Sequence, residues 1–273
     1  MLGAIIGDIA GSKYEFNNIK NENFRLLERD CFYTDDTICT IANMDWLLHA
    51  EERNDDSAAQ FLKKWTNKYL KVSYGGRFVN WIYMKDPKPY GSYGNGSAMR
   101  ISPVAAVAKN LEELELLSNT FTEITHNHPE GMKGALTVAT CIFMALNGHS
   151  KEEIKHYAIK QYPKIKTFRY QKLQREYFFN ETCQGSVPQA IYCFLISTSF
   201  EDCLKKTIAI GGDCDTTSAM SGAIAEAFYG IPQELTKRAL EFLDPEMAEI
   251  VKEFYKHFRI FNKHNCPKDL FII

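Results

Sequence analysis

Hydrophobic residues recur every third or fourth position along most of the chain, which is the spacing of amphipathic helices. Residues 36–50 are typical, because Ile38, Ile41, Ala42 and Trp46 fall on one helical face. Neither hairpin signals nor strands alternating with helices occur, so the sequence predicts an all-α fold. The same helical spacing is found over residues 57–71, 98–108, 111–123, 131–147, 151–160, 187–198, 201–209, 216–229, 234–243 and 246–260.

Small residues repeat at helical spacing near both ends of the chain. Glycine recurs at Gly3, Gly7 and Gly11 in an apolar run without the basic leader of a signal peptide, which we interpret as the first core helix. Stripes of this kind let two helices pack closely, so we expect both helices in the central layer of a bundle. The second stripe consists of Ser218, Ala219, Gly222, Ala223 and Ala227.

Close packing of these two helices has a consequence for the acidic residues near their ends. Asp8 and Glu15 would then lie beside Asp213 and Asp215, although about 200 residues separate them in the sequence. The least regular regions are residues 72–97 and 162–184, which are rich in turn-forming residues. Neither region is polar enough to be a linker, so we expect one domain over residues 1–273.

Composition and charge exclude several classes of protein. Hydrophobic residues make up 45% of the chain, and the net charge is −2, which argues against strong general affinity for nucleic acid or for an anionic membrane. No uninterrupted apolar stretch reaches the roughly 18 residues of a membrane-spanning helix. The eight cysteines show no C-x-x-C spacing, so we expect free thiols and a cytoplasmic location rather than disulfides or a zinc site.

Two acidic clusters are the strongest chemical signal in the sequence. They are Thr34-Asp35-Asp36 and Asp213-Cys214-Asp215-Thr216, and each precedes a helical pattern. Oxygen ligands of this kind suit hard divalent cations, and four carboxylates at one point would repel one another without cations between them. The alternative interpretation is that these residues are helix N-caps. A cap needs one such residue, whereas each cluster supplies three, so the duplication favours a site for two metal ions.

A glycine-rich loop and a histidine pair add candidate anion contacts. Residues 91–97 precede a helix start and expose backbone amides suited to a phosphate, although they match neither nucleotide-binding glycine motif. His126 fits a contact to phosphate or ribose, whereas His128 fits a cap on the helix that follows Pro129. Nearby aromatic residues either stack on a base or belong to the core; they are Tyr74, Phe78, Trp81, Tyr83, Tyr90 and Tyr93.

These motifs together resemble a known family. Residues 7–15, 34–37, 93–100, 125–126 and 211–216 occur in the order seen in ADP-ribosylglycohydrolases, which include the dinitrogenase reductase activating glycohydrolase. The chain is similar to that family over nearly its whole length, and the segment from Cys183 to Ala190 resembles the family's late substrate loop.

The resemblance implies an all-α orthogonal bundle with a central cleft that holds two Mg²⁺ or Mn²⁺ ions. Glu15 matches an acidic residue at the cleft edge, and His126 would contact the diphosphate or ribose. The implied metal ligands are Thr34, Asp35, Asp36, Asp213, Asp215 and Thr216. The implied ADP-ribose loop is Gly91, Ser92, Tyr93, Gly94, Asn95 and Gly96.

The implied reaction is hydrolysis of an N- or O-glycosidic bond to ADP-ribose, with Asp36 or Glu15 as general base. Arginine-linked protein ADP-ribose is the first expectation for the substrate, and serine, nucleic-acid or small-molecule conjugates remain open. Selectivity is expected in residues 17–33 and 162–184. The rival interpretations are another two-metal hydrolase acting on a nucleotide or phosphorylated small molecule, and a non-catalytic member of the fold.

Three residues depart from the family pattern. Cys214 replaces threonine between the aspartates, and Ser218 and Glu226 replace small residues in the helix that follows. Because Glu226 adds a charge to this helix, we expect that face of it to be open. Basic residues over 252–268 are expected to form a solvated helix face or to contact an acidic partner.

Overall fold

The computed structural model describes residues 1–258. It confirms the all-α prediction, because no strand occurs in these residues and the only β-bridge they contain joins Gly94 to Thr182. One domain over residues 1–273 remains a prediction. The helices are α1 (Leu2–Gly11), η1 (Ser12–Tyr14), α2 (Asp35–His49), α3 (Asp55–Lys68), α4 (Gly76–Tyr83), α5 (Gly96–Met99), α6 (Ser102–Val107), α7 (Leu111–Glu123), α8 (Pro129–Leu146), α9 (Lys151–Gln161), η2 (Pro163–Thr167), α10 (Tyr170–Glu176), α11 (Cys183–Ile196), α12 (Phe200–Ile210), α13 (Cys214–Tyr229), α14 (Gln233–Leu240) and α15 (Pro245–Phe258).

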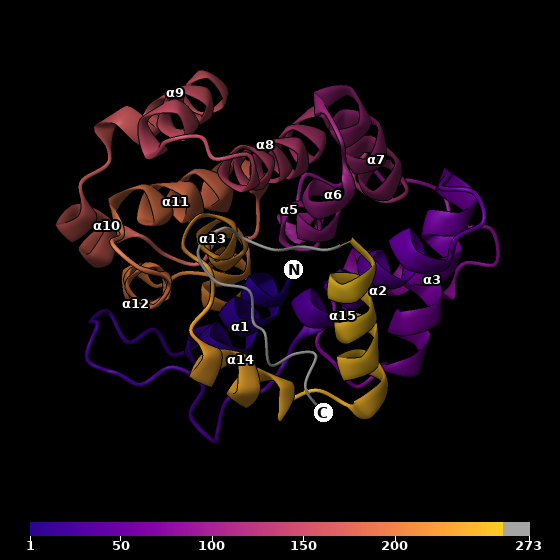
Figure 1. Cartoon of the computed structure of the whole chain (residues 1–273), viewed down its shortest axis with the longest axis horizontal. Coiled ribbons are helices and arrows are strands. Elements are labelled where there is room, and N and C mark those ends of the chain that lie inside the picture. Colours follow the sequence, from indigo (N-terminus) through magenta and orange to yellow (C-terminus); the bar gives the residue numbers. More distant parts are fainter. Residues whose placement is uncertain (259–273) are drawn as a thin grey trace.

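Helices α1 and α13 lie side by side at the centre of the bundle, with α8 and α11 on one side and α2 on another (Figure 1). All ten residues of α1 are buried. A Cβ atom added at Gly3, Gly7 or Gly11 would overlap the α13 backbone, at Gly222, Ser218 and Cys214 respectively. The pairing runs antiparallel and confirms that small residues allow a close approach. The face of α13 that meets α1 is therefore the one with Ser218 and Gly222.

The expectation of an open face around Glu226 is wrong. The Glu226 side chain is buried, with 6% of its surface exposed. Its Oε2 accepts a hydrogen bond of 2.7 Å from the Gly3 N–H, and its Oε1 accepts a short one from the Tyr255 hydroxyl. Burial raises the pKa of this carboxyl, and the two donors oppose that shift. The charge stays inside the bundle because polar partners come from α1 and α15.

Polar side chains fix where several helices begin. Asn54 and Ser150 form capping boxes with the residues three positions later, Ser57 and Glu153. His128 caps α8 as expected, because its side chain accepts a hydrogen bond from the Glu130 N–H. These caps satisfy N–H groups that have no partner within the helix.

Three regions differ from the predicted pattern. Residues 72–97 contain α4, which buries Phe78 and Trp81, and residues 162–184 contain η2 and α10. The helix predicted over 98–108 is divided into α5 and α6, and Pro103 lies in the first turn of the second piece. Proline has no N–H, so Pro103 cannot donate to the Met99 carbonyl four residues earlier, and the first piece does not continue into the second.

Within residues 1–258, no helix is both long and apolar enough to span a membrane. The seven cysteines of this part of the chain are free and buried. The basic positions Arg259, Lys263, His264 and Lys268 of the segment 252–268 lie outside the described residues.

Candidate active site

A cleft of about 580 Å³ lies at the N-terminal end of α13. One wall carries acidic residues that follow η1 or lie at the N-terminal ends of α2 and α13, and another carries the glycine loop and His126. The residues that line it include Glu15, Asp35, Ser92, Tyr93, Gly94, Asn95, Gly96, His126, Asp213, Asp215 and Thr216. The cleft therefore brings together most of the site residues predicted from the sequence.

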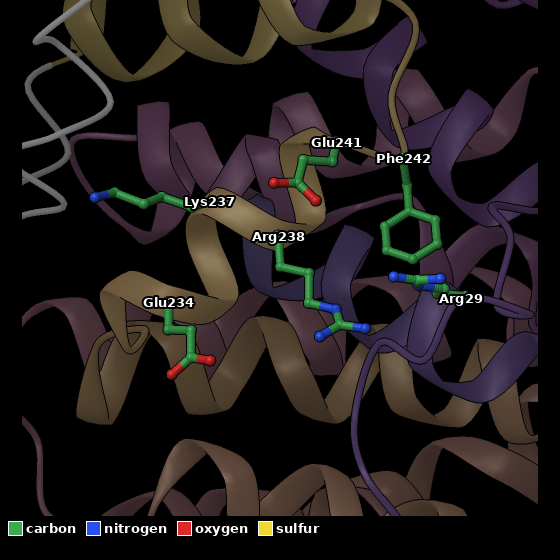
Figure 2. Close-up of a pocket in the computed structure, with 6 residues that line it drawn as sticks. All are labelled: Arg29, Glu234, Lys237, Arg238, Glu241 and Phe242. Carbon is green, nitrogen blue, oxygen red and sulfur yellow. The ribbon is translucent and has the colours of Figure 1, made fainter.

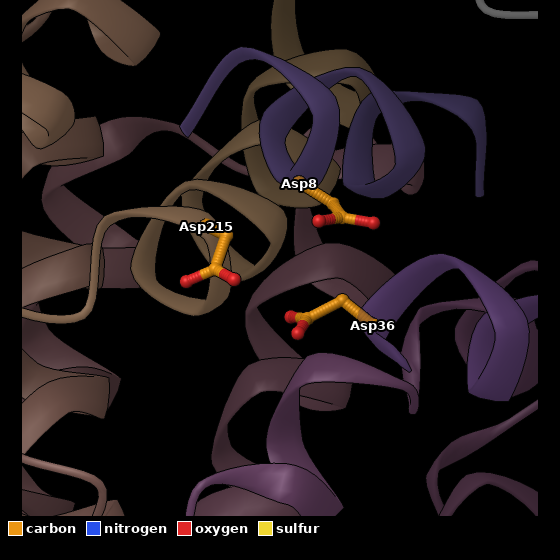
Figure 3. A group of neighbouring side chains, drawn as sticks. All are labelled: Asp8, Asp36 and Asp215. Carbon is orange, nitrogen blue, oxygen red and sulfur yellow. The ribbon is translucent and has the colours of Figure 1, made fainter. Parts of the chain in front are cut away.

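Carboxylates from three helices converge beside this cleft. Figure 3 shows Asp8 from α1, Asp36 from α2 and Asp215 from α13 pointing toward one another. One oxygen of each lies within 4.8 Å of the others. A second group with the same spacing consists of Glu15, Asp213 and Asp215. Asp215 belongs to both groups and links them.

Asp8 positions the first acidic cluster. Its carboxylate accepts hydrogen bonds from the Thr34 N–H at 2.9 Å, the Thr34 hydroxyl at 2.8 Å and the Thr37 N–H at 3.0 Å, and a short one from the Thr37 hydroxyl. The carboxylate thus caps the N-terminus of α2 from a different helix. With four donors around it, Asp8 acts as a support for this segment, a role that the sequence pattern did not assign.

Asp36 has an oxygen without a partner. Its Oδ2 lies 3.2 Å from the Thr216 hydroxyl and 3.3 Å from the Thr34 hydroxyl, whereas its Oδ1 is buried and has no hydrogen-bond partner in the structure. An unpaired buried carboxylate oxygen is costly, and a divalent cation satisfies it. The donor set is all oxygen, so these residues fit Mg²⁺ or Mn²⁺.

The acidic residues strongly affect one another's pKa. Burial raises the pKa of Asp35 to about 8, and the charges of Asp8 and Asp213 add to the shift. Burial, followed by the charge of Asp213, raises the pKa of Asp215 well above its ordinary value and that of Glu15 to about 7. Burial and the charge of Asp8 raise the pKa of Asp36 well above its ordinary value. Cations would relieve this repulsion and favour the ionised forms.

The predicted metal ligands differ in their burial and in the groups that they contact. Asp35 is only partly buried and lines the cleft, but it belongs to neither carboxylate group. The hydroxyls of Thr34 and Thr216 both donate to the same Asp36 oxygen, Oδ2. Asp213 accepts a hydrogen bond of 2.7 Å from the Asn95 side chain. This bond joins the acidic wall directly to the glycine loop.

The glycine loop is held by its neighbours on both sides. The Asn95 N–H donates to the Glu181 carbonyl at 2.7 Å, and the Cys183 N–H donates to the Tyr93 carbonyl at 2.9 Å. Gly91 has a φ of +63°, a conformation that glycine adopts readily, and its N–H donates to the Asn127 side chain at 2.8 Å. These contacts fix the loop from residue 91 to residue 96 as one wall of the cleft.

His126 is neutral and is oriented by a chain of hydrogen bonds. Arg100, 1% exposed, donates from its NH2 group to the Thr125 hydroxyl at 2.6 Å, and that hydroxyl lies 2.7 Å from His126 Nδ1. Because the Arg100 guanidinium only donates, the Thr125 hydroxyl is free to donate onward to Nδ1, which places the ring proton on Nε2. Burial lowers the pKa of His126 well below its ordinary value, and the charges of Arg100 and Arg77 contribute. Nε2 lies beside Gly94 and Gly96.

The cleft also contains residues that the sequence did not mark. Arg100 is one of them, and a lone arginine in an apolar helical run was the available signal. Gly75 and Gly76 belong to the irregular region 72–97 that the sequence did indicate, and they face the cleft from the N-terminus of α4 with no neighbour within 4 Å of an added Cβ. Phe16 and Phe179 line the mouth. Of the suggested aromatics, Tyr74, Phe78, Tyr90 and Tyr93 line the cleft, whereas Trp81 is a core residue.

A second cavity of about 520 Å³ lies along α14 (Figure 2). Its lining combines positive and negative side chains around one aromatic ring, and none of the predicted site residues contributes to it. The lining residues are Arg29, Glu234, Lys237, Arg238, Glu241 and Phe242.

The fold and the cleft thus define an all-α protein with a cluster of buried acidic residues beside a glycine loop. The sequence profile of the ADP-ribosylglycohydrolases matches residues 1–261, and the chain belongs to this family. It is 27% identical to the ADP-ribosylhydrolase ARH3 of Homo sapiens, over 85% of each chain. It is 30% identical to the ADP-ribosyl-[dinitrogen reductase] glycohydrolase of Rhodospirillum rubrum, over 53% of this chain and 49% of that protein. A solved ADP-ribosylglycohydrolase-related protein complex has the same fold, with a TM-score of 0.70, 22% identity and 95% coverage of both chains.

Proposed function

We propose that this protein hydrolyses the glycosidic bond between ADP-ribose and an acceptor group. The observation that carries the proposal is the meeting of Asp36, Asp213, Asp215 and Glu15 beside one cleft with the glycine loop and His126. Acidic residues next to an anomeric carbon stabilise the positive charge that develops when a glycosidic bond breaks. The family membership supports the same reaction.

The glycine loop and His126 would bind the ADP-ribose. The loop wall from Ser92 to Gly96 would face the diphosphate, and the Nε2–H of His126 supplies a neutral donor next to Gly94 and Gly96. Arg100, which also lines the cleft, adds a buried positive charge on this side. The diphosphate therefore has donors on one wall, while the ribose faces the acidic wall.

The proposed metal ligands would hold two divalent cations, Mg²⁺ or Mn²⁺. They are Thr34, Asp35, Asp36, Asp213, Asp215 and Thr216, and the unpaired Asp36 oxygen supports the assignment. Divalent cations in such a site act as Lewis acids and lower the pKa of water. The Asn95 side chain orients Asp213 within this set.

Of the two candidate bases, Glu15 fits better than Asp36. Glu15 is partly exposed and lines the cleft, whereas Asp36 is 2% exposed and does not. In the proposed reaction the bond from the anomeric carbon to the acceptor breaks, and a water oxygen bonds to that carbon. Glu15 takes one proton from the water, and the departing acceptor gains a proton. The products are ADP-ribose and the unmodified acceptor.

The test is release of ADP-ribose from arginine-linked and serine-linked peptides with Mg²⁺ or Mn²⁺, compared between the wild-type protein and Asp215→Asn. We expect metal-dependent release by the wild-type protein and a loss of at least about a hundredfold in the variant. Metal-dependent ADP-ribose binding without release from any conjugate would refute the hydrolase assignment. A cytoplasmic location also remains a proposal, which the seven buried thiols support because such thiols persist in a reducing compartment.

A further inference from the structure

One side chain, Asn18, connects two segments of the site that are far apart in the sequence. The Gly212 N–H donates to Asn18 Oδ1 at 2.7 Å, and Asn18 Nδ2 donates back to the Gly212 carbonyl at 3.0 Å, across 194 positions of the chain. Nδ2 also donates to the carbonyls of Tyr14 at 2.6 Å and Glu15 at 3.1 Å. The acceptor and both N–H groups of the amide are therefore used to join the two segments.

The segments that this amide joins carry residues of the proposed chemistry. One segment contains Glu15, the proposed general base, and the other leads from Gly212 into Asp213. A carboxylate oxygen of Glu15 lies within 4.8 Å of ligand atoms of Asp213 and Asp215. Neither segment is helical at the point of contact, because Glu15 follows η1, and Gly211 and Gly212 have φ values of +75° and +79° before α13 begins. The distance between the base and the acidic cluster therefore depends on contacts from outside the helices.

Lys20 makes a second connection from the same segment. Its amino group donates to the carbonyls of Ile210 at 2.5 Å and Tyr177 at 2.6 Å. Ile210 is the last residue of α12, so the positive charge lies at the negative end of that helix. A Cβ added at Gly211 would overlap both the Asn18 and the Lys20 side chains, so both pack closely on the turn.

The place of Asn18 relative to the cleft defines the kind of role it can have. Asn18 does not line the cleft, whereas Glu15 and Asp213 do. A side chain that does not face the substrate acts on the reaction through the groups that it holds. Removing its amide would free the segment of Glu15 from the turn before Asp213, and a displacement of about 1 Å is enough to slow a reaction that depends on orientation.

We propose that Asn18 is a positioning residue that fixes Glu15 and Asp213 relative to each other. The inference rests on the proposed hydrolase function and adds to it a residue that supports both the base and a metal ligand. Groups that orient metal ligands and bases in this way affect cation affinity and turnover, while substrate binding by a separate wall stays the same. The ADP-ribose loop is such a separate wall, because Asn18 has no hydrogen bond to it.

The experiment compares Asn18→Ala with a matched control, Asn17→Ala. Asn17 is exposed and does not line the cleft, and within residues 1–258 its side chain forms no hydrogen bond. Turnover is measured at saturating Mn²⁺ and expressed per ADP-ribose-binding site, so that a loss of folded protein does not count as a loss of catalysis. We expect kcat of Asn18→Ala to fall about tenfold or more, with unchanged KM and unchanged ADP-ribose affinity. Asn17→Ala should match the wild-type protein, and Asn18→Ser replaces Asn18→Ala if that variant does not fold.

Titration of Mn²⁺ into the metal-free proteins separates this inference from the hydrolase assignment. We expect Asn18→Ala to bind Mn²⁺ about tenfold more weakly than Asn17→Ala. If the wild-type protein cleaves no conjugate, weaker Mn²⁺ binding by Asn18→Ala still supports the positioning role, and only the hydrolase function is refuted. If conjugates are cleaved, and Asn18→Ala equals Asn17→Ala in turnover per site and in Mn²⁺ affinity, the positioning role is overturned while hydrolysis stands.

Discussion

The Thr125 hydroxyl lies 2.7 Å from Nδ1 of His126 and 2.6 Å from the Arg100 guanidinium, so one small side chain connects a buried cation to a histidine in the cleft. The contact determines which ring nitrogen carries the proton, and with it what His126 offers to a ligand. A donor at Nε2 suits an oxygen-rich ligand such as a phosphate or a ribose.

Replacing Thr125 by valine should therefore weaken ADP-ribose binding. The change removes the hydroxyl and keeps the shape, and a lost hydrogen bond of this kind costs about 1 kcal/mol, or roughly fivefold in affinity. Calorimetry measures the affinity, and ¹⁵N NMR of the imidazole shows the loss of the Nε2–H tautomer. The matched control is Thr122→Val, because the buried Thr122 hydroxyl has no hydrogen-bond partner in the structure. Equal effects of the two variants would contradict the proposed role of Thr125.

A second prediction concerns the support that Asp8 gives to α2. Thr37→Val removes a buried hydroxyl that donates to the Asp8 carboxylate, and we expect the free energy of unfolding to fall by about 1.5–3 kcal/mol. Thr40→Val is the control, since Thr40 lies one turn later on α2 and its buried hydroxyl lacks a partner in the structure. Denaturant unfolding of both metal-free variants checks the difference. If Thr40→Val lowered the free energy of unfolding as much as Thr37→Val, the loss would come from exchanging the side chain itself and not from the hydrogen bond to Asp8.

The close contact of α1 and α13 predicts that replacing a helical glycine by alanine lowers the stability of the protein, whereas this change usually raises it. Alanine favours a helix over glycine by about 1 kcal/mol, yet Gly7→Ala should destabilise the protein by about 1–3 kcal/mol because the added Cβ overlaps the Ser218 backbone. Gly76→Ala, at the open start of α4, should leave stability unchanged or raise it. Thermal unfolding compares the two. Stabilisation by Gly7→Ala would mean that the helices are further apart than the structure has them.

The acidic cluster predicts how the stability of the metal-free protein depends on pH. The pKa of Asp35 is 3.8 in the unfolded chain and about 8 in the fold, so the fold binds more protons between these values. Stability should therefore fall as the pH rises from about 4 to 8 in the presence of a chelator. Mg²⁺ or Mn²⁺ should stabilise the protein most at the upper end of this range, where the carboxylates are ionised. Asp35→Asn should flatten the metal-free profile, and a metal-free protein that gains stability with rising pH would refute this account.

The local spacing of apolar residues and the capping residues were sufficient to predict many of the helices. The helix predicted over 111–123 is α7, Leu111–Glu123, because its apolar spacing and the Asn110 cap agree with each other. The proximity of Glu15 and Asp215 also followed from the sequence, since the glycine stripe around Gly7 required a close partner helix.

The sequence-based predictions failed where contacts between residues far apart in the sequence determine the structure. The isolated charge of Glu226 suggested an exposed face, but Gly3 and Tyr255 satisfy it inside the bundle. Helix α4 was missed because glycines and prolines on either side hide its three buried residues, Phe78, Trp81 and Ile82. The link from Arg100 to His126 depends on a tertiary contact between residues that lie 25 positions apart, which no local spacing reveals.

The pairing of the first helix with one near the end of the chain has a kinetic consequence. Asp8 and Asp215 come together only when a loop of about 200 residues closes, and contacts between such distant segments form late because closure is entropically costly. Intermediates that contain only the helices between them would lack the complete set of acidic residues. Acquisition of cation affinity during refolding would then report the final step of assembly, and a nascent chain would gain it only after α13 has left the ribosome.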